Sequence, residues 1–177
     1  MTSRREGGDD LVLVLGLGNP LRGDDGVGCR LIEELARREL PPGVQVLDGG
    51  TAGLRLLDLL EGWERVIVVD AAEMGRRPGE FLRFTPADVR LASMPDRCSL
   101  HHAGLSEVLA LADALGEPLP DIVIFGVQPA QVGWGEGLSA AVEAALPALA
   151  KAVLEVIGEQ TADHRHQTTE GQQGSGV

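Results

Sequence analysis

The sequence predicts an α/β fold: a three-layer α/β/α domain built on a mostly parallel, roughly five-stranded twisted sheet. Short, uninterrupted apolar runs alternate along the chain with segments whose apolar residues have helical spacing. Aromatic residues make up only 3% of the chain, and tyrosine is absent, so the core must consist of aliphatic side chains. Both observations are typical of parallel strands that helices bury on both faces.

The expected strands are of two kinds. Continuous apolar runs predict strands buried on both faces at Leu11–Leu15, Val66–Val69 and Ile122–Val127, with a shorter strand at Val44–Leu47. The segment Glu80–Phe84 alternates between apolar and charged residues, which predicts an exposed or edge strand.

The expected helices separate these strands. From Val27 to Leu40 the apolar residues gather on one side, and Pro41-Pro42-Gly43 ends the pattern. Further helices are expected from a cap at Thr51 through Leu60, from Ala103 to Leu115, and from Ser139 to about Ile157, with Pro147 inside the last. The resulting order, β-α-β-α-β-β-α-β-α, predicts a single domain over residues 10–158. We expect a flexible head at residues 1–9 and a disordered, polar tail at residues 159–177.

The charge balance narrows the choice of partners. The chain carries 15 Lys and Arg against 27 Asp and Glu, a formal net charge of −12, which disfavours nucleic acid and anionic membrane as partners. No apolar run reaches the roughly 20 residues that span a bilayer, and residues 1–10 do not resemble a secretory signal. We therefore expect a cytoplasmic protein whose two cysteines, Cys29 and Cys98, are reduced thiols.

A glycine-rich loop, GLGNPLRGDDGVG at residues 16–28, joins the first strand to the first helix. Such loops often hold phosphate, but this one carries two adjacent carboxylates, Asp24 and Asp25, which would repel it. The spacing is not GxGxxG, and the chain has neither a Walker lysine nor the GxSxG motif of many serine hydrolases. The loop therefore suits a cation better than a phosphate.

Further polar residues follow the ends of other expected strands. Asp70 ends the VIVV strand, and the turn-rich segment before the third helix brings His101. Because ligands of open α/β sheets bind outside the carboxyl ends of the strands, Asp25, Asp70 and His101 are expected to meet above one sheet edge. Such a set suits a divalent transition metal, or acid–base chemistry with a water.

Each residue also has a structural interpretation. One of the two loop carboxylates, preferably Asp24, is placed to cap the helix that starts near Gly26. Asp70 is able to bond a neighbouring loop, and His101 is equally compatible with an ordinary surface position. Cys98, three residues before His101, forms either half of a nucleophile pair or, more simply, a small buried apolar group.

Five motifs in a fixed order carry a family resemblance: GLGNPLRGDDGVG, DGGTAG at 48–53, VVDAA at 68–72, SLHHAGL at 99–105 and GVQP at 126–129. From about Leu11 to Ile157 the chain resembles the endopeptidases that mature nickel-iron hydrogenases. DGGTAG is similar to the branch that serves membrane-bound uptake hydrogenases. The resemblance implies a twisted sheet with helices on both faces, and an aspartic-type endopeptidase by family classification.

The resemblance also implies a substrate and a site. Family members remove a short C-terminal extension from the hydrogenase large-subunit precursor, and only after nickel insertion. By motif, Asp25, Asp70 and His101 would contact nickel supplied by the substrate, with Asp25 and Asp70 as the catalytic carboxylates and no tightly bound cofactor in the resting enzyme. Some members have Glu where this chain has Asp25, and the choice between Asp24 and Asp25 as the ligand stays open. Substrate binding or loop support is expected from Asn19, Asp24, Gly49, Gly50, Thr51, His102 and Gln128.

Two alternative functions accompany this hypothesis. The first is a module that recognises the nickel site without cutting. The second is a peptidyl-tRNA hydrolase, a family that resembles this chain in its opening GLGNP. That family then carries a tyrosine and a catalytic histidine, whereas residues 21–28 here read LRGDDGVG, and the negative charge disfavours tRNA.

Overall fold

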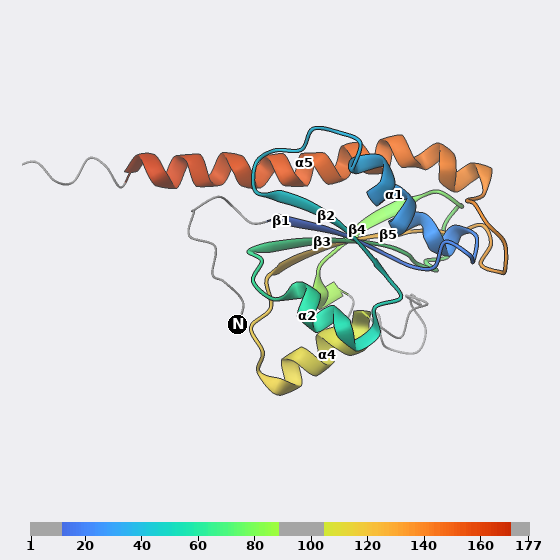
Figure 1. Ribbon diagram of the computed structural model, residues 1–177, viewed down its shortest axis with the longest axis horizontal. Helices are drawn as coiled ribbons and strands as arrows, with labels where there is room; N and C mark the ends of the chain where they lie inside the picture. The colour runs from blue at the N-terminus through green and yellow to red at the C-terminus, as the bar shows by residue number, and fades with distance from the viewer. Residues whose placement is uncertain (1–11, 89–104, 171–177) are drawn as a thin grey trace, which may run out of the picture.

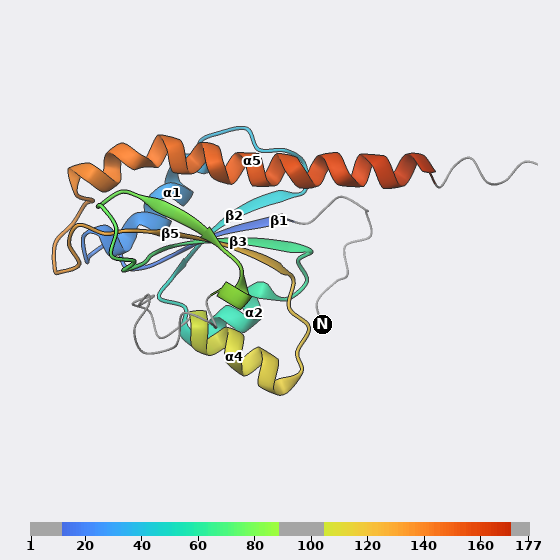
Figure 2. The same ribbon diagram turned by 180° about the vertical axis from the view of Figure 1, so that it is seen from behind.

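The computed structural model describes residues 12–88 and 105–170, with the backbone alone for residues 160–170. A five-stranded sheet lies between two layers of helices: α1 and α5 cover one face, and α2 and α4 cover the other (Figure 1). The view from behind shows the same arrangement (Figure 2). The predicted three-layer α/β/α architecture is confirmed.

The strands pair in the order β2-β1-β3-β5-β4. Their bounds are β1 Val12–Leu17, β2 Val44–Gly50, β3 Arg65–Ala71, β4 Phe81–Phe84 and β5 Asp121–Val127. All pairs are parallel except β4–β5. Strand β4 lies at one edge of the sheet, as its alternating sequence predicted. Strand β2 lies on one side of β1, and β3, the next strand along the chain, lies on the other side of β1. The strand order therefore reverses between β1 and β3, the position at which open α/β sheets bind ligands.

The two faces of the sheet share the aliphatic side chains by simple alternation. In β3, Ile67 and Val69 pack into the core formed with α1 and α5, whereas Val66 and Val68 pack into the core formed with α2 and α4. Each strand therefore needs apolar residues at successive positions, which explains the uninterrupted apolar runs.

The predicted helices are all present, but α1 and α2 are shorter than expected and α5 is longer. Their bounds are α1 Val27–Leu35, α2 Leu56–Leu60, α4 Leu105–Leu115 and α5 Ala140–Glu170. Helix α1 ends at Leu35 and not at Leu40, because residues 36–39 are exposed and Pro41 disfavours helical backbone just before it. Thr51 does not cap α2, because a 3₁₀ turn at Gly53–Arg55 precedes that helix. Ala52 occupies the N-cap position of the 3₁₀ turn and makes no side-chain hydrogen bond to it.

Helix α5 extends into the segment that was predicted to be a disordered tail. It continues past Ile157 to Glu170, so residues 159–170 are helical, whereas the polar composition predicted disorder from residue 159. Neither glycine nor proline occurs between Glu159 and Glu170 to interrupt the helix, and Gly171 follows. Within the described residues, no helix combines the length and apolarity needed to cross a membrane.

Candidate carboxylate site at the sheet edge

The candidate site lies at the strand-order reversal, where the loop after β1 meets the end of β3. Two glycines allow the loop to fold back against the sheet. Gly18 has a φ of +116°, and a Cβ there would lie 1.7 Å from the carbonyl oxygen of Asp25. At Gly28 a Cβ would lie 2.3 Å from the carbonyl oxygen of Leu17 and 2.4 Å from that of Val69. The start of α1 therefore rests directly on the ends of β1 and β3.

Asp25 is buried inside the short 3₁₀ turn Asp24–Gly26. Its Oδ2 atom accepts a hydrogen bond from the backbone N–H of Asn19 at 3.1 Å. The side chain of Asn19 accepts the N–H of Leu21 at 3.0 Å, so Asn19 shapes the loop through its backbone and its side chain. The assignment of Asn19 as loop support fits this geometry.

Asp70 lies within β3 and is fully buried. Its Oδ1 atom accepts the N–H of Ala71 at 2.8 Å, but its Oδ2 atom has no hydrogen-bond partner among the described residues. Burial and, to a smaller extent, the negative charge of Asp25 raise the pKa of Asp70 to about 7. The site thus joins two buried carboxylates whose charges repel, and a proton or a cation bound there would relieve that repulsion.

Asp24 performs a different task from its neighbour. Its Oδ1 atom accepts the N–H of Ser139 at 2.6 Å, and its Oδ2 atom accepts the N–H of Ala130 at 2.7 Å, the N–H of Gln131 at 3.1 Å and the hydroxyl of Ser139 at 2.9 Å. The expected cap of the helix near Gly26 is wrong, because no side chain caps the 3₁₀ turn or α1. Asp24 instead supports the start of α5, where the Ser139 hydroxyl accepts the N–H of Val142 at 3.5 Å. These four bonds occupy Asp24, which leaves Asp25 as the loop carboxylate that interacts with Asp70.

Cys29 is a site residue that the sequence did not single out for a role. Its thiol donates to the Asp48 carboxylate at 3.1 Å and lies 3.4 Å from the carbonyl oxygen of Gly18. Burial and the hydrogen bond to Asp48 raise the pKa of Cys29 to about 12, so the thiol is not an activated nucleophile. It joins the loop after β1 to the end of β2. The signal in the sequence was its place in the first turn of the helix after the glycine-rich loop.

The motif DGGTAG forms the end of β2 and the turn that follows it. The N–H of Gly18 donates to the carbonyl oxygen of Gly50 at 3.0 Å, and Gly50 has a φ of +51°. At Gly49 a Cβ would lie 2.9 Å from side-chain atoms of Leu15 and Leu17. Gly49 and Gly50 therefore support the loop, whereas Thr51 is exposed.

Gln128, just after β5, also supports a loop. Its buried amide accepts the N–H groups of Met74 at 2.7 Å and Arg76 at 3.1 Å, and donates to Glu73 at 2.9 Å and to the carbonyl oxygen of Pro129 at 3.2 Å. These bonds hold the segment that follows Asp70.

The remaining predicted residues cannot be placed in the site. His101, His102 and Cys98 lie outside the described residues. Within residues 12–88 and 105–170, no group of three or more His, Cys, Asp or Glu side chains is arranged to hold a metal ion. The described part of the site is therefore a pair of carboxylates that needs at least one further ligand to hold a transition metal.

The chain is similar to proteins of hydrogenase maturation. The family model described as hydrogenase maturation protease matches residues 29–156. The hydrogenase expression/formation protein HupD of Bradyrhizobium diazoefficiens is 41% identical over 133 residues, which cover 74% of this chain and 69% of HupD. The hydrogenase 2 maturation protease of Escherichia coli is 34% identical over 150 residues, covering 84% of this chain and 91% of that protein.

Solved structures agree with these relatives. The hydrogenase maturating endopeptidase HybD from Escherichia coli superposes with a TM-score of 0.74 at 33% identity, covering 85% of this chain and 93% of HybD. The hydrogenase 2 maturation peptidase from Thaumarchaeota archaeon SCGC_AB-539-E09 superposes with a TM-score of 0.64 at 35% identity, covering 84% of this chain and 98% of that peptidase. These similarities favour the hydrogenase resemblance over the peptidyl-tRNA hydrolase alternative. The chain belongs to the hydrogenase maturation protease family.

Proposed function

We propose that this protein is a cytoplasmic endopeptidase that removes the C-terminal extension of a nickel-iron hydrogenase large-subunit precursor after nickel has been inserted. Family membership supports a processing role on a hydrogenase subunit. The observation that carries the finer proposal is the fully buried Asp70, whose Oδ2 atom has no hydrogen-bond partner among the described residues and whose neighbour is another carboxylate.

The carboxylate pair supplies the recognition of nickel. A divalent cation arriving with the precursor would neutralise Asp25 and Asp70 and give Oδ2 of Asp70 the partner that it lacks. In this proposal His101 completes the contact, and the substrate brings the nickel, so the resting enzyme holds no tightly bound cofactor. A precursor without nickel would leave the repulsion between the two buried carboxylates in place, and it would be bound less tightly for that reason.

The same pair supplies the base for an aspartic-type hydrolysis. A water oxygen adds to the scissile carbonyl carbon while a carboxylate accepts a proton from the water. The proton then passes to the leaving amine as the carbon–nitrogen bond breaks. In the cation-free protein, burial raises the pKa of Asp70 to about 7, and a general base works best with a pKa near the working pH. In the nickel-loaded complex, the carboxylate oxygen of the pair that does not contact the cation would accept the proton.

Incubation of the protein with nickel-loaded and nickel-free precursor tests the proposal on a denaturing gel. We expect a small mobility increase of the nickel-loaded precursor alone, and its loss in Asp70→Asn and His101→Ala. Asp58→Asn, which removes an exposed carboxylate of α2, is the control and should cut normally. Full activity of both site variants would reject the assigned residues. Binding without any cleavage by the wild type would favour the non-catalytic module.

A further inference from the structure

Three exposed apolar side chains lie on two backbone segments that are joined beside the site. Leu21, Val132 and Trp134 are 51%, 38% and 86% exposed. The N–H of Gly135 donates to the carbonyl oxygen of Leu21 at 3.0 Å, and the N–H of Gly23 donates to that of Gly135 at 2.9 Å. A β-bridge also pairs Gly23 with Val132. The loop after β1 and the β5–α5 loop (residues 128–139) therefore present one surface.

This surface is held firmly relative to the carboxylate pair. Asp24 accepts hydrogen bonds from Ala130 and Gln131 near the start of the β5–α5 loop and from Ser139 at its end. The carboxylate of Asp24 is fully buried, and the next residue is Asp25. The position of the exposed apolar residues is thus coupled to the position of Asp25.

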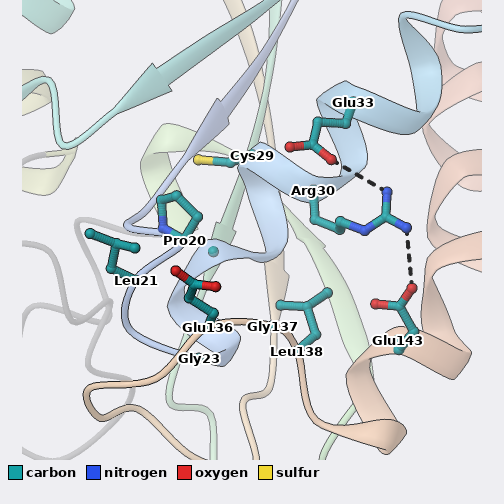
Figure 3. A pocket seen from close by; sticks show the side chains of 11 residues that line it. Pro20, Leu21, Gly23, Cys29, Arg30, Glu33, Glu136, Gly137, Leu138 and Glu143 are labelled. Atoms are coloured by element: carbon teal, nitrogen blue, oxygen red, sulfur yellow. Dashed lines mark hydrogen bonds and ion pairs between the residues drawn. The ribbon is translucent and has the colours of Figure 1, made fainter.

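A cavity of about 290 Å³ opens on the same loops, large enough for a substrate side chain (Figure 3). Pro20, Leu21 and Leu138 supply apolar walls. Figure 3 shows Arg30 on the α1 side of the cavity, engaged in ion pairs with Glu33 and Glu143. We call Leu21, Val132, Trp134 and this cavity the docking surface.

We propose that the docking surface binds an apolar segment of the nickel-loaded hydrogenase precursor. In this proposal the hydrogen bonds of Asp24 fix the position of the surface relative to Asp25. This inference rests on the proposed function, which it deepens by naming where the protein substrate binds. Trp134 is 86% exposed, and tryptophan is enriched among the residues that dominate binding energy at protein interfaces. The precursor is a better occupant than a second copy of this chain, because two chains with a net charge of −12 each repel one another. It is also the partner that must reach Asp25 and Asp70.

Cleavage kinetics with nickel-loaded precursor, together with biolayer interferometry on immobilised precursor, test the inference. Trp134→Ala should raise KM and Kd about tenfold and leave kcat within about twofold. The matched control is Leu115→Ala, which removes a side chain 61% exposed at the end of α4, and it should change none of these values. Val132→Ser should weaken binding in the same direction as Trp134→Ala.

Each outcome decides the inference. Equal KM and Kd for Trp134→Ala and Leu115→Ala would overturn it, as would a wild type that does not bind the precursor. Light scattering that shows a dimer lost in Trp134→Ala, with KM and Kd unchanged, would assign the surface to a second copy and overturn it as well. Trp134-dependent binding by a wild type that never cleaves would support the docking surface while rejecting the proposed function.

Discussion

Asp24 and Ser139, 115 residues apart in the sequence, are joined by two hydrogen bonds. The N–H of Ser139 donates to Oδ1 of Asp24 at 2.6 Å, and its hydroxyl donates to Oδ2 at 2.9 Å. The same carboxylate also accepts the N–H groups of Ala130 and Gln131. One buried side chain therefore joins the glycine-rich loop to both ends of the β5–α5 loop. Asp24 therefore has a structural role distinct from that of its neighbour Asp25, whose negative charge contributes to the raised pKa of Asp70.

Asp24→Ala should lower the free energy of unfolding by at least about 3 kcal/mol, because it leaves several buried N–H groups without an acceptor. Ser139→Ala, which removes one of the four hydrogen bonds and the cap of α5, should cost about 1 kcal/mol. Urea unfolding followed by circular dichroism measures both values. A cost for Asp24→Ala no larger than that for Ser139→Ala would contradict the role of Asp24.

The raised pKa of Asp70 makes stability depend on pH in a defined direction. The folded state keeps the proton up to a pH of about 7, whereas the unfolded state loses it near 3.8, the ordinary pKa of an aspartic acid. The folded state therefore binds more protons between these values, and stability falls as the pH rises through this window, by up to about 4 kcal/mol. Asp70→Asn should remove this dependence and should be more stable than the wild type at pH 8, although inactive.

Urea unfolding of the wild type and Asp70→Asn between pH 4 and pH 8 provides the measurement. The quantity to compare is the difference in unfolding free energy between the two proteins at each pH, which cancels the contributions of other groups. Asp58→Asn serves as the charge-matched control. A constant difference between Asp70→Asn and the wild type over the whole range would show that Asp70 titrates normally in the folded protein.

Glycine is required at Gly28 by the contact of α1 with the sheet. A Cβ there would lie 2.3 and 2.4 Å from two backbone carbonyl oxygens, which cannot move aside as a side chain can. Gly28→Ala should therefore destabilise the protein by about 3 kcal/mol or more and disturb the loop that carries Asp25. At Gly158, in α5, a Cβ would meet no atom within 4 Å, so Gly158→Ala should be neutral or stabilising by up to about 1 kcal/mol. Thermal unfolding of the two variants would refute the argument if their effects were similar.

The thiol of Cys29 should resist alkylation in the folded protein. Burial and the bond to Asp48 raise its pKa to about 12, so almost no thiolate is present at pH 8. Iodoacetamide treatment followed by peptide mass mapping measures the labelling of Cys29 separately from that of Cys98. We expect slow labelling of the native protein and rapid labelling in urea. Equal rates in the two conditions would contradict this environment.

The layered fold was predictable because the apolar pattern reports burial directly. The runs at β1, β3 and β5 are continuous because both faces of each strand are covered, and the alternation of β4 reflects its edge position. Helix ends were less predictable. Leu40 continues the helical spacing, but Pro41 and the exposed residues before it end α1 at Leu35.

The candidate site was predictable only where chain topology determines it. Asp25 follows β1 and Asp70 lies near the carboxyl end of the neighbouring parallel strand β3, so both residues were expected at the carboxyl edge of the sheet. The partner of Asp24 was not predictable, because a carboxylate at the start of one helix gives no sign that it bonds the start of another, 115 residues away. The hydrogen bond between Cys29 and Asp48 was not predictable either, because nothing in the local sequence around Cys29 indicates which distant residue it contacts.

The central claim is that Asp25 and Asp70 detect the nickel that the precursor carries. It is tested most directly by the Kd of nickel-loaded and nickel-free precursor for the wild type and for Asp70→Asn, measured side by side by biolayer interferometry. We predict that the wild type binds the nickel-loaded form at least about tenfold more tightly, a difference of about 1.4 kcal/mol, and that Asp70→Asn loses this preference. An equal preference for the nickel-loaded form in both proteins would contradict the claim.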